Sequence, residues 1–229
     1  MSGWPLQGNP LLAAAERGAS VGDRMLRLHY LTAHWIGPGQ AADGCSCGQA
    51  GCPAPTEHPI KPDWFQAATA DLWMVRARWL HHPRANLAVV TGERFDVLAC
   101  DQATGRIALG MLPEPLGPVA WTGGGRLLIF TRSGLDAGLL HCDQRAPARW
   151  VYRHGRGSYV PLPRAQHASG RLADWVYPAG LPLPGWAEVQ RVLVEAAWRL
   201  QAHGRLLAAG QRVRWALVGL VATRKWADL

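Results

Sequence analysis

Two kinds of pattern indicate an α+β protein, in which helices pack on an antiparallel sheet. Short apolar runs rich in β-branched residues, at 86–90 and 95–100, are joined by a four-residue turn. Two more such runs, at 119–121 and 127–130, flank three successive glycines. Pairs of apolar runs separated by a short turn are typical of β-hairpins. Elsewhere apolar residues recur at helical spacing, most clearly over 186–203.

The N-terminal part predicts two helices. An alanine-rich stretch at 11–17 is long enough for one short helix. Residues 23–34 favour an amphipathic helix, because apolar residues fall three or four positions apart and Gly37-Pro38-Gly39 follows as a stop signal. The residues that carry this second pattern are Met25, Leu28, Leu31 and Trp35.

The loop at 44–62 is dense in cysteine, glycine and proline, and reads CSCGQAGCPAPTEHP from residue 45. Its spacing, Cys-x-Cys-x4-Cys-x5-His, supplies the four soft or borderline ligands of a closed tetrahedral Zn²⁺ site. Four protein ligands leave no open position, so we expect structural zinc. The alternative is a flexible loop with free thiols. The expected ligands are Cys45, Cys47, Cys52 and His58.

The rest of the chain predicts further helices and one more hairpin. Residues 71–81 form an amphipathic helix that Pro83 ends. The segment 134–142 fits either a helix or a strand, and a helix is slightly favoured. The remaining expected elements are a short helix at 105–112, hairpin strands at 150–152 and 158–162 around a glycine turn, and a last helix at 205–225.

The charge balance suits a polyanionic partner. The formal net charge is +8, with 24 basic against 16 acidic residues. Only two of the basic residues are lysines, and an arginine-rich, alanine-rich composition is also typical of a GC-rich genome, so a merely solvated basic surface stays open.

Nothing in the sequence indicates export or membrane insertion. No secretory signal opens the chain, and no uncharged run reaches the roughly 18 residues needed to span a membrane. We therefore expect a cytoplasmic protein without membrane contact. Structural disulfides are rare in that compartment. The five cysteines are therefore expected to bind metal or to lie buried.

A series of short motifs follows one order between residues 69 and 175. In this order and spacing they resemble the bifunctional DNA primase/polymerase (Prim-Pol) domain of the archaeo-eukaryotic primase superfamily. Divergent actinobacterial members are similar in carrying a Cys/His insertion. The matching residues are Ala68 to Asp71, Trp79, Pro83 to Leu87, Thr91, Gly92, Ala99 to Asp101, Thr122, Gly124 to Leu127, Tyr159 to Pro163, His167 and Gly170.

The resemblance implies an RRM-like, Prim-Pol-type antiparallel sheet with packed helices, carried by a palm-like domain at 67–178. Residues 1–66 then supply an N-terminal helix and a zinc knuckle, and residues 179–229 supply a C-terminal helical pair. Nucleic acid or a nucleoside triphosphate is the partner that the resemblance implies, whereas a protein partner stays unidentified.

The sequence departs from the family pattern at the catalytic positions. Polymerase chemistry needs two carboxylates to hold two metal ions about 4 Å apart. The resemblance puts the family's Asp-x-Asp at Ala99 and Asp101, so that one acid remains. It puts the family's histidine at Leu127 and a third acid at Val151. Asp96 does not substitute, because an odd spacing from Asp101 turns it to the other face of a strand. Mg²⁺ or Mn²⁺ is expected only if catalysis survives.

The remaining polar residues still fit the binding of a nucleotide or nucleic acid. Three successive glycines bring backbone N–H groups close to a bound phosphate. We expect Arg126, Arg153 and Arg156 to surround one hollow beside them. The expected binding residues are Thr122, Gly124, Gly125, Arg126, Arg153, Arg156 and His167, with Asp101 as the remnant catalytic residue.

Three functions follow from these patterns. The first is a catalytically degenerate Prim-Pol-like protein that binds nucleic acid or nucleotide. The second is an active or altered nucleotidyltransferase that uses Asp101. The third is a non-catalytic protein-interaction module that kept the core and lost the site. Nucleotide titration with and without Mg²⁺ separates the three.

Overall fold

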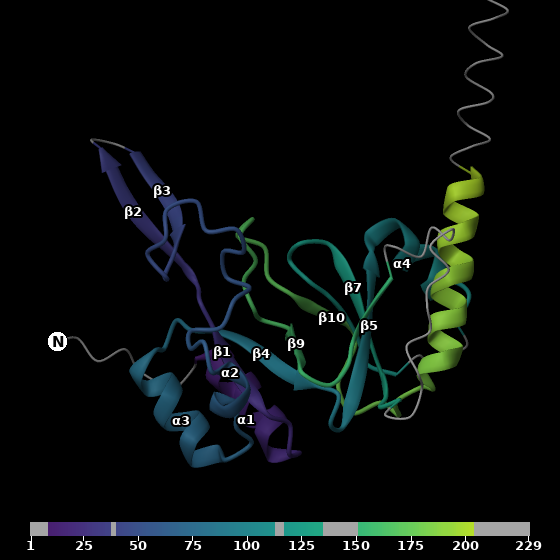
Figure 1. Cartoon of the computed structure of the whole chain (residues 1–229), viewed down its shortest axis with the longest axis horizontal. Helices are drawn as coiled ribbons and strands as arrows, with labels where there is room; N and C mark the ends of the chain where they lie inside the picture. The colour runs from purple at the N-terminus through teal and green to yellow at the C-terminus, as the bar shows by residue number, and fades with distance from the viewer. Residues whose placement is uncertain (1–8, 38–39, 113–116, 135–150, 204–229) are drawn as a thin grey trace, which may run out of the picture.

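The protein consists of two antiparallel sheets, a two-stranded ribbon and helices packed on the sheets, which confirms the predicted α+β class (Figure 1). These elements come from a computed structural model. The structure describes residues 9–37, 40–112, 117–134 and 151–203.

The smaller sheet has three strands in the order β1-β4-β9, and the larger has five in the order β10-β6-β7-β5-β8. All strand pairs are antiparallel. The strands of the smaller sheet are β1 (Met25–Leu28), β4 (Asn86–Thr91) and β9 (Ser158–Pro161). Those of the larger sheet are β5 (Phe95–Asp101), β6 (Val119–Trp121), β7 (Arg126–Arg132), β8 (Tyr152–His154) and β10 (Asp174–Tyr177).

Two of the three predicted hairpins are wrong, because β4 and β5 belong to different sheets, as do β8 and β9. Of the three predicted hairpins, β6 and β7 alone pair across their turn. Every residue of β4 is buried, and so is all of β5 except Asp101 at its end. A strand that is apolar on both faces suits the interior of packed sheets, whereas a hairpin with one solvated face alternates polar and apolar residues.

The two connections that cross between the sheets lie against each other. Thr91 Oγ1 donates a hydrogen bond to the carbonyl of Gly155 at 2.8 Å. A Cβ on Gly92 would lie 1.9 Å from the backbone nitrogen of Arg156, and Gly92 has a φ of +85°. Both the close approach and the left-handed conformation require glycine at this position.

Residues 23–34, where the spacing predicts a helix, instead form β1 and the start of β2 (Leu31–Gly37). Met25 packs between the two sheets, whereas Leu26 and Leu28 pack on the opposite face of the smaller sheet. Leu26 lies outside the helical stripe and is nevertheless buried. Burial of both strand faces therefore explains the apolar pattern, and the helix prediction is wrong.

The main core lies between the two sheets and is closed by α1 (Pro10–Ser20) and α3 (Leu72–His81). The helices predicted at 11–17 and 71–81 are thus confirmed. Asn9 caps α1 by accepting hydrogen bonds from the N–H groups of Leu11 and Leu12. Asp71 caps α3 in the same way by accepting from Met74.

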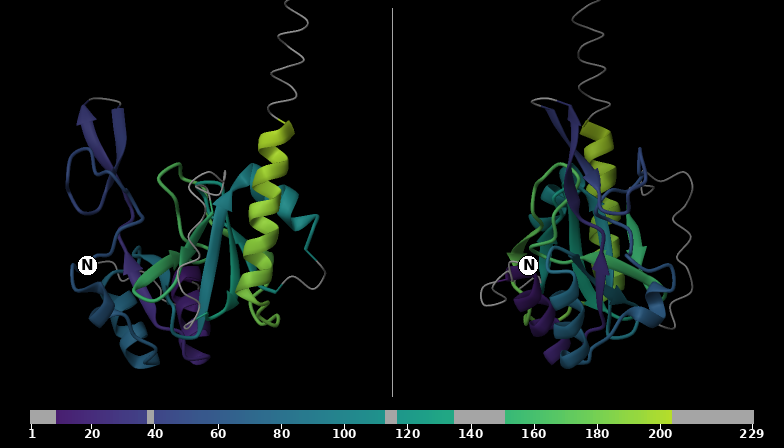
Figure 2. Two further views of the ribbon diagram at one scale, coloured as in Figure 1. Left: turned by 45° about the vertical axis from the view of Figure 1, so that its right-hand side comes forward. Right: turned by 90° about the vertical axis from the view of Figure 1, so that its left-hand side faces the viewer.

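A second core lies on the outer face of the larger sheet. There α4 (Gln102–Leu109) and helix 186–203 pack on the strands, and four residues of the apolar stripe predicted for this helix, Val189, Val192, Leu193 and Ala196, are buried. Figure 2 shows this helix and the pair α1–α3 at opposite ends of the molecule. The outer face of the smaller sheet is covered by the short α2 (Trp64–Ala67).

The ribbon of β2 and β3 (Gln40–Cys45) stands out from the body (Figure 2). The helix predicted at 205–225 and nearly all of the segment 134–142 lie outside the described residues. Within the described ranges, no helix combines the length and the apolar character that a membrane crossing requires.

Candidate functional site

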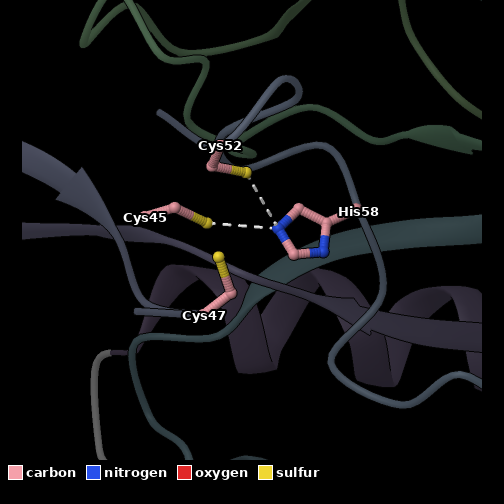
Figure 3. Close-up of side chains that lie close together, drawn as sticks. All are labelled: Cys45, Cys47, Cys52 and His58. Carbon is pink, nitrogen blue, oxygen red and sulfur yellow. Dashed lines mark hydrogen bonds between the residues drawn. The ribbon is translucent and has the colours of Figure 1, made fainter. Parts of the chain in front are cut away.

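The Cys/His loop brings its four predicted ligands together. The ligand atoms of Cys45, Cys47, Cys52 and His58 all lie within 4.8 Å of one another. His58 Nε2 lies 3.2 Å from Cys45 Sγ and 3.4 Å from Cys52 Sγ, and the sulfur of Cys47 points into the same space (Figure 3). Three sulfurs and one imidazole nitrogen form the donor set of a structural zinc site. The residues therefore fit the predicted metal.

Local backbone geometry favours metal binding at this knuckle, which comprises residues 45–58. Burial raises the pKa of the Cys45 thiol, but backbone N–H groups of Cys47 and Thr56 and the His58 ring outweigh it and lower this pKa to about 7. The pKa of Cys52 is raised, by burial and by the neighbouring thiols. A metal ion removes that repulsion, because it binds the thiolate forms.

Hydrogen bonds from three strands hold the knuckle to the body. The backbone N–H of His29, just after β1, donates to the carbonyl of His58 at 2.9 Å. The Tyr159 hydroxyl of β9 donates to the carbonyl of Glu57 at 3.0 Å. Asn86 at the start of β4 donates from its side chain to the carbonyls of Thr56 and Gln166. The knuckle is thus fixed to one end of the smaller sheet.

Sequence reasoning did not find the role of Asn86. The side chain is buried, and its Oδ1 also accepts a hydrogen bond from the backbone N–H of Gln166 at 2.7 Å. It therefore links the knuckle to the turn that carries His167. A buried amide at the start of an apolar strand must find partners, and that was the signal available in the sequence.

The glycine turn between β6 and β7 packs against His167. A Cβ on Gly124 would lie 2.9 Å from His167 Nε2, and Ser169 Oγ donates to the carbonyl of Gly123 at 3.3 Å. His167 Nε2 also lies 3.5 Å from Glu57 Oε1 of the knuckle. The structure therefore brings the predicted residues Thr122, Gly124, Gly125, Arg126 and His167 to one place, next to the knuckle.

A small hollow lies where the knuckle meets the glycine turn. Thr56, Glu57, Thr122 and His167 are among its lining residues. Thr56 is buried with a φ of +70°, and its hydroxyl has no hydrogen-bond partner among the residues that the structure describes. The Thr56 N–H lies beside the Cys45 thiol and helps to lower the pKa of that thiol, while Thr56 keeps a conformation that is rare for a β-branched residue.

Asp101, the remaining acid of the predicted catalytic pair, acts as the N-cap of α4. Its Oδ1 accepts hydrogen bonds from the N–H groups of Ala103 and Thr104, at 2.9 and 3.0 Å. Its Oδ2 accepts from the Thr104 hydroxyl at 2.7 Å. Both carboxylate oxygens therefore have partners within the chain.

The other three catalytic positions, Ala99, Leu127 and Val151, lie in the apolar cores. Ala99 is 1% exposed and lies in the main core, on the same face of β5 as Asp101. Leu127 is fully buried in the second core, where a Cβ on Gly105 of α4 would lie 2.9 Å from Leu127 Cβ. Cys100 lies in that core too, and burial raises its pKa to about 12, so it is a buried thiol as expected.

Buried Asp96 forms an ion pair with the partly buried Arg153 on the opposite face of β5. Arg153 Nη2 lies 2.6 Å from Asp96 Oδ2, and the N–H of Gly134 donates to the same oxygen at 3.0 Å. Arg153 pairs in register with Leu98, whereas Arg126 pairs with Asp101, so the two arginines lie on opposite faces of the sheet. The expectation that they surround one hollow is therefore wrong. Arg156 is exposed on the turn that contacts Gly92.

Antiparallel sheets, a strand that ends in an aspartate and a glycine turn beside that end are the features that the resemblance to primase/polymerase domains led us to expect. The chain belongs to the Prim-Pol family, described as bifunctional DNA primase/polymerase, N-terminal, which matches residues 11–186. The match takes in the Cys/His loop and both sheets. No curated protein matches the chain.

Proposed function

We propose that this Prim-Pol domain binds single-stranded nucleic acid or a nucleoside triphosphate and does not polymerise nucleotides. The absence of polymerisation is supported by strand β5, in which Asp101 caps a helix and Ala99 is buried in the core. Two-metal catalysis needs two carboxylates that face one site. Among the described residues, that face of β5 presents one carboxylate only.

Binding is supported by the arrangement at the glycine turn. Gly125 has a φ of +79°, which glycine allows, and the turn is closed by the N–H groups of Gly125 and Arg126, which donate to the carbonyl and the hydroxyl of Thr122. Arg126 follows directly, and His167 packs on Gly124. Because the carboxylate of the family is absent at Ala99, a phosphate meets less negative charge here and needs no bridging metal ion. The formal net charge of +8 adds a favourable long-range field.

The knuckle belongs to the same proposal as a structural zinc site. Its four ligands leave no position open for substrate, so zinc here holds the loop rather than acting in chemistry. Through Asn86 and Glu57 the loop in turn contacts the turn that bears His167. In this proposal zinc organises one wall of the binding site.

Fluorescence anisotropy with a labelled single-stranded oligonucleotide tests the binding, in EDTA and in Mg²⁺. We expect equal affinity in both buffers at low salt, and a steep fall as salt rises, because counterion release dominates such binding. Arg126→Ala should weaken it, whereas Arg191→Ala, an exposed arginine on helix 186–203, should not. Calorimetry with a triphosphate makes the same comparison for the nucleotide.

Two results would contradict the proposal. Undetectable binding at low salt favours the protein-interaction function. Template-directed primer synthesis with Mg²⁺ or Mn²⁺ that is lost in Asp101→Ala favours a surviving nucleotidyltransferase.

A further inference from the structure

The side chains of Arg126 and Tyr152 approach each other over β5. Arg126 is on β7 and Tyr152 is on β8, and these strands flank β5 on its two sides. Neighbouring strands lie about 4.8 Å apart, so β7 and β8 are roughly 10 Å apart. Yet the Arg126 guanidinium carbon is 6.0 Å from the centre of the Tyr152 ring. The two side chains therefore lean toward each other and meet over β5.

The strand register shows over which part of β5 the Arg126 and Tyr152 side chains lie. Arg126 pairs with Asp101, and Tyr152 pairs with Ala99, so all four residues project from one face of the sheet. The Arg126 guanidinium and the Tyr152 ring therefore approach each other on the face of β5 that carries Asp101 and Ala99. The resemblance puts the family's first carboxylate at position 99, whereas this chain has a methyl group there and a guanidinium on the same face.

The charge of Arg126 and the exposure of Tyr152 favour the binding of a nucleotide between these strands. The Tyr152 side chain is half-exposed on the edge strand β8, so one ring face is available for contact. His154, two residues along on the same face, has a pKa lowered by burial and by the charge of Arg126, and is therefore neutral at pH 7. Arg126 supplies the positive charge beside the ring.

We propose that Arg126 and Tyr152 form a nucleotide subsite, in which the guanidinium takes a phosphate where the family uses metal-bound carboxylates and the Tyr152 ring stacks on the base. This rests on the proposed function. A guanidinium binds phosphate oxygens through two parallel hydrogen bonds. An aromatic ring stacks on any base, so the subsite accepts single strands without strong sequence preference.

Anisotropy with two oligonucleotides of equal length separates the base from the phosphate. One is oligothymidylate, and the other has the same backbone without bases. Tyr152→Ala should weaken binding of oligothymidylate about tenfold and leave the abasic strand almost unchanged, since stacking contributes roughly 1–3 kcal/mol per base. Tyr152→Phe should bind like the wild type, and Arg126→Ala should weaken both strands. Competition by free dTTP shows whether one nucleotide suffices.

A matched pair of variants tests the position of the guanidinium. Ala99→Asp and Ala99→Asn add side chains of equal size to the same buried site, so both suffer the same crowding. The aspartate should pair with Arg126 and weaken metal-free binding at least tenfold more than the asparagine does. Thermal unfolding of both variants controls for folding.

The outcomes distinguish this subsite from the proposed function. If the wild type binds the two strands equally, and Tyr152→Ala leaves both affinities unchanged, the subsite is wrong although nucleic-acid binding stands. Equal effects of Ala99→Asp and Ala99→Asn also contradict it. Absence of any oligonucleotide or dTTP binding by the wild type overturns both.

Discussion

The knuckle and strand β5, which carries Asp101, lie in one family domain, but their polar side chains are held in place by different interactions. The knuckle draws its four ligands from residues 45–58, and their donor atoms converge although the loop has little apolar core. In β5 both faces are buried in separate cores, and its one terminal acid caps a helix. A loop without a core depends on its ligands, whereas a core strand persists when its catalytic residues are replaced.

The largest expected effect comes from removing one ligand of the knuckle. Cys47→Ser should abolish the binding of about one zinc ion per chain, since a closed site needs all four ligands. Elemental analysis of protein purified without added metal measures this loss. Hydrogen exchange should then quicken at residues 44–62 and stay slow in β5, because the core that holds β5 does not include the loop.

Cys100→Ala serves as the matched control, because it removes a buried cysteine that lies outside the cluster. It should leave the zinc content unchanged. Full protection of residues 44–62 in metal-free protein would refute a metal-dependent knuckle, and the contrast with β5 would fail.

A smaller effect is expected from breaking the ion pair between Asp96 of β5 and Arg153. Arg153→Ala leaves Asp96 buried without its charged partner, and should lower the free energy of unfolding by about 3 kcal/mol, a typical cost of breaking a buried pair. Urea denaturation measures it. Exposed Arg156→Ala is the control and should change stability little.

Oligonucleotide affinity should survive Arg153→Ala, because this arginine faces away from Arg126. A variant that keeps full stability but loses affinity would assign Arg153 to the binding site.

The smallest expected effect concerns Asp101. Asp101→Ala should destabilise the protein by about 1 kcal/mol, as loss of an N-cap does, whereas Asp101→Asn should be nearly neutral because asparagine caps equally well. The midpoints of thermal unfolding test this order. Equal destabilisation by both variants would mean that the charge of Asp101, rather than its cap, is what the fold requires.

The knuckle could be predicted from the sequence because its ligands are close together along the chain, so their spacing alone indicates which residues come together. The helices at 11–17, 71–81 and 186–203 were predictable for the same local reason. Strand pairing was not, because an apolar run such as 86–91 is compatible with any partner. The direction of Arg153 followed from the register of β8 against β5, which no local pattern encodes.

Residues 23–34 show how two periods can be confused. Met25, Leu28 and Leu31 satisfy helical spacing, yet Leu26 is equally buried and belongs to no helical stripe. A strand buried on both faces produces such a run, and the pairing of β1 with β4 decides the structure there. Long-range pairing thus overrode a local pattern that was correct in its spacing.

The crossing of the two connections between the sheets has a consequence for how the domain unfolds. Each sheet contains strands whose continuation belongs to the other, and the turns at Gly92 and Arg156 touch where they cross. Opening either sheet therefore displaces both connections between the sheets and disturbs the second sheet. We therefore expect the two sheets to unfold as one cooperative unit, in a single transition. Because its contacts join distant parts of the sequence, this unit also assembles slowly compared with a helical bundle of the same length.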